Sequence, residues 1–330
     1  MKKILLAALA FGALVSCSKD EIISINQETI GFSNAFVDNT TRADAAEDPS
    51  YGASAAALNQ FNVWGAINTK DAYLPVFAGE SVSGAVGTNS VWNCEKTQYW
   101  VEDAVYNFAG LVNAGTGVIL GENKLPAKVD FAVSTGKVDL LYAVSDTYTG
   151  LASNNPLVKM DFNHLLSKVM FTVNNTSTDA TEYSFLVRNI TINGATAGTC
   201  ALPAMTWTST AAQVGNFTAF STIPVGGGVA KQVCESELLL IPGAVNVSFT
   251  IDIIYSGKTI ATHNYATTAA QTLEVGHAYN FVINVSVGLP IQFTVESHPE
   301  WKNGNTADSD DTDTEFDHIV LPVVEETTGA

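Results

Sequence analysis

Short segments of alternating apolar and polar residues are the feature that most limits the fold class of this chain. The cleanest of them, Tyr279 to Val287, has an apolar side chain at every second position, and a β-strand turns alternate residues to opposite faces. Glycines interrupt such segments at short intervals, and no segment predicts a helix longer than a turn or two. Short strands that are joined by glycine-containing turns favour a β-sandwich. We therefore expect an all-β protein.

Further strands are expected along the whole chain. The nearly continuous apolar run 138–144 predicts a strand that is buried on both faces. Asn193-Gly194 predicts a hairpin turn, and Ser256-Gly257 marks a point where the chain can turn back. The first expected strand is 22–37, with Ile30, Phe32 and Phe36 on one face. The other expected strands are 61–65, 91–92, 99–101, 105–112, 161–173, 183–192, 249–255, 291–295 and 319–324.

Length and charge limit the possible organisation and partners. The chain has 330 residues, enough for two domains, and its 46% of hydrophobic residues predicts a well-filled core. The polar turn Asn154-Asn155-Pro156 predicts the boundary, with one sandwich at 61–156 and a second at 157–302. The formal net charge of −18 excludes binding to nucleic acid by charge attraction.

The first residues predict export as a lipoprotein. Two lysines precede the apolar run Ile4 to Val15, which is typical of a secretory signal and too short to span a bilayer of about 30 Å. The run ends at Ser16-Cys17 and resembles the lipobox of bacterial lipoproteins. That resemblance implies a signal peptide at 1–16, which is cut before Cys17, and acylation of the Cys17 thiol. The alternative is an ordinary signal peptide with a chance cysteine.

No motif predicts catalysis, a metal site or a cofactor. No serine lies in a G-x-S-x-G elbow, and the five histidines lack HxxxH spacing. The acidic run from Asp308 fails as a calcium loop, because its sixth and twelfth positions are Asp313 and Ile319. The cysteines other than Cys17 show no CxxC spacing, so they are either buried free thiols or one disulfide plus one buried thiol: Cys94, Cys200 and Cys234.

Several short motifs occur in one order along the chain. They are the lipobox, Thr41-Arg42-Ala43, Phe61 to Gly65, Asp139 to Ala143, Phe162 to Val169, Gly276 to Phe281, and Ile291 to Val295 with Trp301. In this order they resemble the fimbrillins of Bacteroidetes, the subunits of type V pili. The resemblance implies two tandem transthyretin-like β-sandwich domains. It also implies that an arginine-specific protease removes the first strand, and that a strand of the next subunit fills the groove left behind.

Two segments would carry this assembly. Residues 17–60 contain a linker, the first strand and a polar loop, in which Arg42-Ala43 is the implied cleavage site. The alternative for Arg42 is an ordinary solvated loop residue. Residues 303–330 form an acidic spacer and a short apolar segment, in which Ile319, Leu321 and Val323 share one face and are the candidate donor residues. Pro322 argues against this role, since proline cannot donate to a ladder. The alternative is that the segment folds back as the last strand of its own domain.

The expected function is that of a structural subunit of a cell-surface fimbria, not an enzyme. The expected partners are other subunits bound head-to-tail, the protease, and the outer membrane through the lipid before maturation. Ser18 to Glu21 resembles the acidic signal that directs Bacteroidetes lipoproteins to the outer face of that membrane. The alternative is a surface adhesin that binds a host or dietary glycan or a protein without polymerising. Its candidate stacking residues are Trp92, Trp100 and Trp207, although aromatic residues in strands more often belong to a core.

Overall fold

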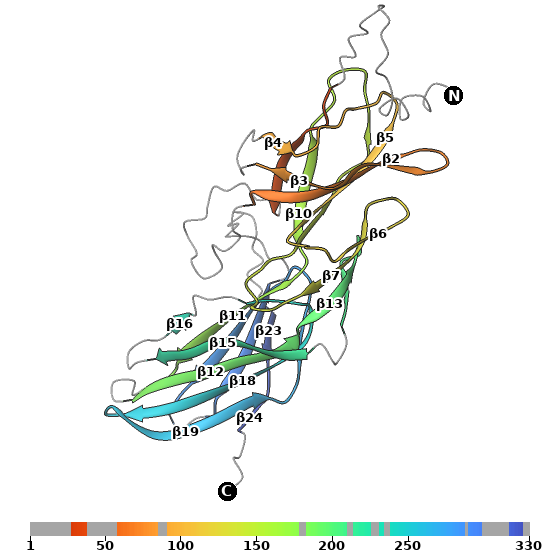
Figure 1. Ribbon diagram of the computed structural model, residues 1–330. Coiled ribbons are helices and arrows are strands. Elements are labelled where there is room, and N and C mark those ends of the chain that lie inside the picture. The colour runs from red at the N-terminus through yellow and green to blue at the C-terminus, as the bar shows by residue number, and fades with distance from the viewer. Residues whose placement is uncertain are drawn as a thin grey trace, which may run out of the picture.

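The computed structural model describes residues 28–37, 58–84, 91–177, 183–209, 214–225, 231–233, 238–287, 290–298 and 317–325. Every regular element within these ranges is a β-strand, which confirms the all-β class (Figure 1). An N-terminal domain, a small bridging sheet and a C-terminal domain follow one another along the molecule (Figure 1). Among the described residues no helix is long and apolar enough to cross a membrane.

The sheet of the N-terminal domain closes on itself. Its strand order is β2-β3-β4-β1-β10-β8-β5-β9, and β2 also pairs with β5, so all strands except β9 form a ring. In this ring β1 lies between β4, to which it is antiparallel, and β10, to which it is parallel. The strands are β1 (Phe32–Val37), β2 (Gln60–Asn68), β3 (Tyr73–Ser83), β4 (Val91–Cys94), β5 (Val105–Val112), β8 (Leu141–Val144), β9 (Tyr148–Thr149) and β10 (Val158–His164).

An aromatic core fills this ring. Period-2 alternation turns one side chain in two inward from each strand, and these side chains pack into one cluster. Phe32, Phe61 and Phe108 come from β1, β2 and β5 and are at most 1% exposed. Trp92 and Trp100 are 2% and 3% exposed in the same cluster. Both are therefore core residues and are not available to stack on a glycan.

A four-stranded bridging sheet joins the two halves of the chain. Its order is β14-β13-β7-β6, and it combines β6 (Val118–Leu120) and β7 (Pro126–Ala132) with β13 (Ala197–Ala201) and β14 (Thr206–Thr208). The indole Nε1 of Trp207 donates to the Leu165 carbonyl at 2.7 Å. Val129 and Cys200 of this sheet are fully buried in a core cluster that also contains Trp64 of the N-terminal domain.

Two sheets form the C-terminal sandwich. The first has the order β16-β11-β21-β22-β23, with β17 also paired to β11. The second has the order β15-β12-β18-β19-β24, with β20 also paired to β18. The first contains β11 (Ser167–Asn175), β16 (Lys231–Val233), β17 (Leu238–Leu240), β21 (Ala278–Val285), β22 (Gln292–His298) and β23 (Asp317–Val320). The second contains β12 (Tyr183–Ala195), β15 (Val214–Val225), β18 (Gly243–Tyr255), β19 (Lys258–Thr267), β20 (Gln271–Leu273) and β24 (Val323–Glu325).

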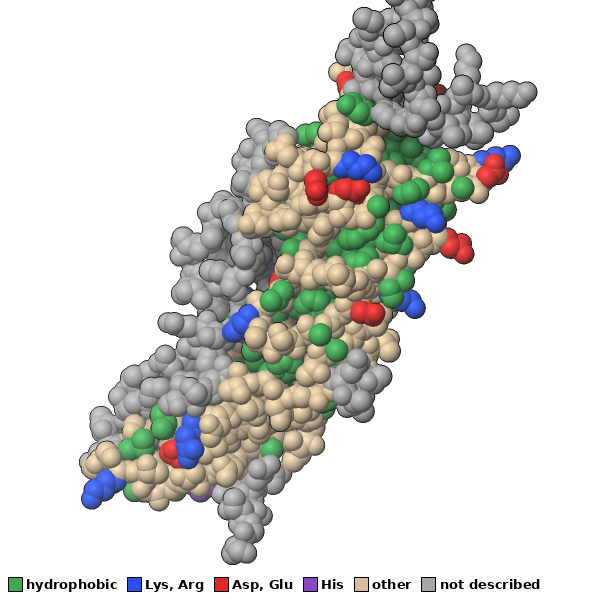
Figure 2. Space-filling model, viewed as in Figure 1, with side chains coloured by type: hydrophobic (Ala, Val, Ile, Leu, Met, Phe, Trp, Pro, Cys, Tyr) green, Lys and Arg blue, Asp and Glu red, His purple; other side chains and the backbone are tan. Residues whose placement is uncertain are grey.

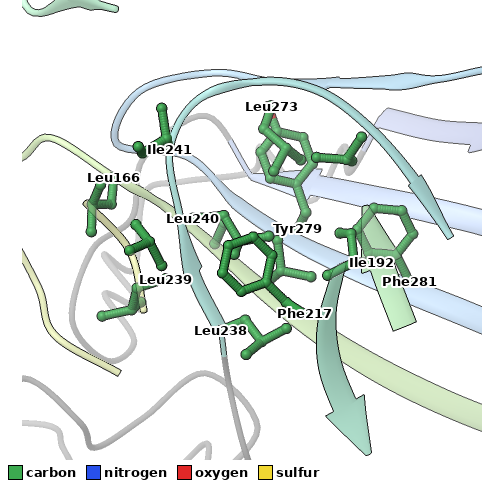
Figure 3. Close-up of a cluster of buried hydrophobic side chains, with 14 of the residues drawn as sticks. Leu166, Ile192, Phe217, Leu238, Leu239, Leu240, Ile241, Leu273, Tyr279 and Phe281 are labelled. Carbon is green, nitrogen blue, oxygen red and sulfur yellow. The ribbon is translucent and has the colours of Figure 1, made fainter. Parts of the chain in front are cut away.

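The core of the sandwich lies between these sheets. The rings of Phe249 and Phe293, one from each sheet, are 5.6 Å apart, and Phe281 stacks on Phe293 at 5.7 Å. At the end nearest the bridging sheet, all three residues of β17 are buried. Figure 3 shows Leu238 and Leu240 of this strand together with Phe217 and Ile192, which come from the second sheet. Continuous apolar packing therefore runs from the sandwich into the bridging sheet.

The boundary between the domains differs from the expectation. Residues 157–302 were expected to form the second sandwich, but β10 pairs with β1 and β8 of the N-terminal ring. The chain leaves the N-terminal domain only after His164, and the turn at Leu165–Leu166 divides the expected strand 161–173 into β10 and β11. The reason is that an apolar alternation identifies a strand and not the sheet that it joins.

Two local expectations fail and one is confirmed. Only Leu141–Val144 of the run 138–144 is a strand, and Val138 is 49% exposed. Asn193-Gly194 lies inside β12, where it pairs with β15, so it is not a turn. Ser256-Gly257 does form the turn between β18 and β19, with φ of 47° and 74°, the left-handed region that short hairpins require.

Candidate functional site at the first strand and the C-terminal tail

Phe32 is the centre of the first strand's contact with the domain. Its ring lies 5.9 Å from that of Phe61, 5.7 Å from that of Phe77 and 6.1 Å from that of Phe108, and the side chain is fully buried. Edge and tilted contacts at these distances are favourable arrangements of aromatic rings. The neighbouring Ile30 is 5% exposed in the same cluster. Ile30 and Phe32, two of the side chains expected on one face of the first strand, therefore lie in the core.

Backbone hydrogen bonds hold this segment on both sides. Val158 N–H donates to the Gly31 carbonyl at 2.8 Å, which begins the parallel ladder with β10. On the other side Ile30 N–H donates to the Gln98 carbonyl at 2.8 Å, and Thr29 forms an isolated antiparallel bridge with Tyr99. The first strand is thus inserted between two neighbours and is not an edge strand.

A carboxylate-binding site fixes the start of the segment. The Glu28 carboxylate accepts hydrogen bonds from Asn154 N–H at 2.7 Å, Asn155 N–H at 2.6 Å and Asn155 Nδ2 at 3.1 Å. Asn154 has a φ of 60°, and such a turn can direct successive N–H groups at one anion. The backbone N–H of Asn155, followed by that of Asn154, lowers the pKa of Glu28. We call these three donors the Asn154–Asn155 nest.

Sequence reasoning missed this contact. Asn154-Asn155-Pro156 was interpreted only as a domain boundary, and Glu28 was assigned no role. The available signal was weak, because an acidic residue before an apolar strand and an Asn-Asn turn are each common. Only the fold brings two segments together that are separated by 126 positions in the chain.

The C-terminal tail, residues 317–325, folds back on its own sandwich. β23 pairs with β22, Leu321 N–H donates to the Phe293 carbonyl at 2.9 Å, and β24 pairs with β19. Leu321 is 6% exposed in the core, and Val323 packs against the same cluster. The structure therefore agrees with the alternative expectation, in which the segment folds back onto its own domain. A donor role for Ile319, Leu321 and Val323 requires the tail to leave this position, and it stays a proposal.

The tail lies at sheet edges. β23 is the last strand of the first sheet and β24 is the last strand of the second, so each pairs with one neighbour. Pro322 lies between the two strands, where its missing N–H removes no bond from either ladder. Its carbonyl accepts from Thr268 N–H at 3.0 Å. The tail can therefore detach without breaking a ladder in the middle of a sheet.

The expected lipidation and cleavage residues, Cys17, Arg42 and Ala43, lie outside the described residues. The chain has one other arginine, Arg188, in β12. Its guanidinium donates to Asp252 at 2.7 and 3.1 Å, and this pairing lowers the pKa of the Asp252 carboxyl. The Arg188 backbone pairs with β15 on one side and β18 on the other. An arginine-specific protease, which binds extended chain, cannot reach this bond in the folded domain.

The structure answers part of the cysteine question. Cys94 and Cys200 are free thiols, and Cys234 lies outside the described residues. Burial raises the pKa of Cys200 to about 12, so its thiol stays protonated at neutral pH. In the part of the chain that the structure covers, no group of three or more His, Cys, Asp and Glu residues is arranged to hold a metal ion.

Charge does not mark a docking surface on the visible face. Figure 2 shows the described Lys, Arg, Asp and Glu side chains singly or in small mixed groups, and not as a patch of one sign. The contacts of the first segment instead come from two neighbouring strands, an aromatic cluster and the Asn154–Asn155 nest.

Comparison with solved structures finds proteins with a similar all-β fold. A crystal structure of a fimbrial protein from Bacteroides vulgatus is similar, with a TM-score of 0.59, 14% identity, and coverage of 83% of this chain and 99% of that one. A candidate cell adhesion protein from Bacteroides ovatus has a TM-score of 0.50 at 14% identity, with 84% and 99% covered. At these identities the likeness shows the fold.

The family follows from the sequence match. A family model described as fimbrillin-like matches residues 41–299, and the chain belongs to that family. This confirms the resemblance drawn from the motifs. Membership identifies a fimbrial or adhesin-like subunit of the cell surface, and the family is structural and adhesive, not enzymatic. No curated protein matches the chain.

Proposed function

We propose that this chain is a structural subunit of a cell-surface fimbria that polymerises by strand exchange after cleavage between Arg42 and Ala43. The observation that supports it most is the position of β1. This strand ends at Val37, before the proposed cleavage site, and it lies between β4 and β10 in the N-terminal ring. Cleavage would leave β1 attached only by noncovalent contacts, so that another strand can replace it.

Loss of β1 would open the ring at one place. β4 and β10 would then present unpaired backbone groups, and the pocket of Phe61, Phe77 and Phe108 would lose its central ring. An extended segment from a second subunit satisfies both needs, through main-chain hydrogen bonds and alternate side chains. A contact of this head-to-tail kind does not close on itself, so it generates a filament.

The proposed donor is the C-terminal tail, with Ile319, Leu321 and Val323 as the groove-filling residues. In its own sandwich β23 pairs on one side only, whereas the place of β1 offers pairing on both sides. The move therefore exchanges the ladders with β22 and β19 for ladders with β10 and β4, on the two sides of one strand. The acidic spacer of about 15 residues before the tail could reach roughly 50 Å when extended.

The proposed route of export begins with lipidation and ends with proteolytic release. Cys17 is the proposed lipidation site after removal of residues 1–16, and the lipid holds the precursor at the outer face of the outer membrane. An arginine-specific protease is the proposed partner that releases the subunit for assembly. The lipobox, the acidic residues after it and the family membership support this route. No cofactor and no nucleic acid takes part.

Limited proteolysis of the purified precursor that begins at Ser18 tests the assembly step. An arginine-specific protease should cut only after Arg42 and give an SDS-resistant ladder of multimers whose subunits begin with Ala43. Arg42→Ala should abolish cutting and ladder together, whereas Arg188→Lys, the matched control, should change neither. A precursor that is cut after Arg42 and stays monomeric would contradict strand exchange and favour the non-polymerising adhesin.

A further inference from the structure

Two five-residue segments of this chain share one pattern. Glu28-Thr29-Ile30-Gly31-Phe32 and Asp317-His318-Ile319-Val320-Leu321 both read acidic, polar, isoleucine, variable, large apolar. In the first segment the acidic residue and the two apolar residues make the contacts described above. Glu28 is held by the Asn154–Asn155 nest, and Ile30 and Phe32 are 5% and 0% exposed. The tail therefore repeats the residue types that hold β1 in place.

We propose that the Asn154–Asn155 nest is the carboxylate site of the acceptor groove and binds Asp317 from the tail of a second copy of this chain. This inference rests on the proposed function and adds the register of the exchange. Asp317 takes the place of Glu28, Ile319 that of Ile30, and Leu321 that of Phe32. Three N–H donors, which lose their carboxylate when the first segment departs, regain one from the donor.

A register device is needed because a strand can slide by two residues without changing the face it presents. A slide in one direction would place Asp317 in the pocket of Ile30, where a carboxylate is costly to bury. A slide in the other direction would place Ile319 at the nest, which would leave the N–H donors of Asn154 and Asn155 without an acceptor. Only the proposed register matches an acid to the nest and an apolar side chain to each pocket.

The likeness between the two segments ends where the first regular stretch of pairing of β1 with β10 ends. In β1 the pairing with β10 shifts register between Ser33 and Phe36. In the tail Pro322 follows Leu321 and takes the place of Ser33. The first regular stretch of pairing with β10 thus ends at Ser33, and pairing resumes at Phe36. Proline is tolerated next to such an irregularity.

Disulfide trapping between subunits tests the register. Tyr99 pairs with Thr29 and is 42% exposed, so a cysteine at 99 faces whichever donor residue occupies that place. In a Cys94→Ser background, multimers of a His318→Cys, Tyr99→Cys subunit should cross-link and survive boiling without reductant. The matched pairs Phe316→Cys with Tyr99→Cys and Val320→Cys with Tyr99→Cys report a slide by two residues in either direction and should not cross-link.

A charge variant tests the nest itself. Asp317→Asn keeps the shape of the side chain and removes its charge, so assembly should require on the order of tenfold more subunit, while Glu325→Gln should assemble like the parent. Cross-linking at 316 or 320 in place of 318, or unchanged assembly of Asp317→Asn, overturns the inference and leaves strand exchange standing. Absence of multimers from every cleaved variant and from the parent overturns strand exchange itself.

Discussion

At the scale of single residues, the packing of Phe32 explains why the precursor and the cleaved subunit must differ. This side chain is fully buried among Phe61, Phe77 and Phe108, yet it lies on the part of the chain that the proposed cleavage removes. A residue can therefore stabilise the folded monomer strongly and contribute nothing to the fibre. On the proposed function, the same residue shields the aromatic pocket until cleavage removes it.

Phe32→Ala should lower the free energy of unfolding of the uncleaved precursor by about 3–5 kcal/mol, since it leaves a cavity in a packed core. Urea denaturation followed by tryptophan fluorescence measures this change. Ile260→Ala, at a site that is 57% exposed, is the control and should change stability little. Fibres grown from cleaved Phe32→Ala subunits should match parent fibres in stability, and a weaker mutant fibre would mean that the first strand is retained.

At the scale of elements, the C-terminal tail is part of a sandwich and lies at the edges of both of its sheets. β23 and β24 are edge strands of two different sheets, and the buried Leu321 lies between them. The tail therefore stabilises its own domain without lying inside either sheet. This is the arrangement that a strand needs if it is to serve one domain before assembly and another afterwards.

Deletion of residues 316–330 should give a folded subunit with a lower melting temperature that fails to polymerise after cleavage. The loss of the buried Leu321 side chain alone predicts about 2–5 kcal/mol of destabilisation. Circular dichroism during heating measures the first effect and an SDS ladder the second. Pro322→Ala, an exposed site between the strands, should assemble normally. Polymerisation of the deleted subunit would show that the donor lies elsewhere, and complete unfolding would show that the tail cannot leave.

At the scale of the whole molecule, the bridging sheet couples the two domains. β7 belongs to the first half of the chain and β13 to the second, and they pair over residues 128–132 and 197–201. One core cluster contains Trp64 and Leu111 of the N-terminal ring together with residues of the C-terminal sandwich. The junction is thus packed core and not a linker. It therefore keeps β1 and the C-terminal tail in a defined relation.

Calorimetry of the uncleaved precursor should therefore show one unfolding transition. Val129→Ala, at a fully buried position of the bridging sheet, should lower that single transition, with a cost of about 2 kcal/mol. The exposed substitution Ile119→Ala in the neighbouring β6 is the control. Two separate transitions in the parent protein would mean that the domains unfold independently and that the bridging sheet transmits little.

The sequence by itself determined the local and compositional features. Alternation along Tyr279 to Val287 correctly identified a strand, and Ser256-Gly257 identified the turn between β18 and β19, because both depend on residues that are neighbours in the chain. The order of short motifs identified the family. The apolar face that contains Leu321 predicts burial, and Leu321 is buried. The pattern is compatible both with folding back and with donation to another subunit, because an apolar face does not specify which sheet covers it.

Only the tertiary structure decided which strands are neighbours. It placed β10 in the N-terminal ring, closed that ring through β2 and β5, and brought Glu28 to Asn154 and Asn155. Each of these contacts joins segments far apart in the chain, and their pairing depends on twist, packing and competition among all the strands at once. Period-2 alternation is alike in every strand, so it does not specify with which other strand a given strand pairs.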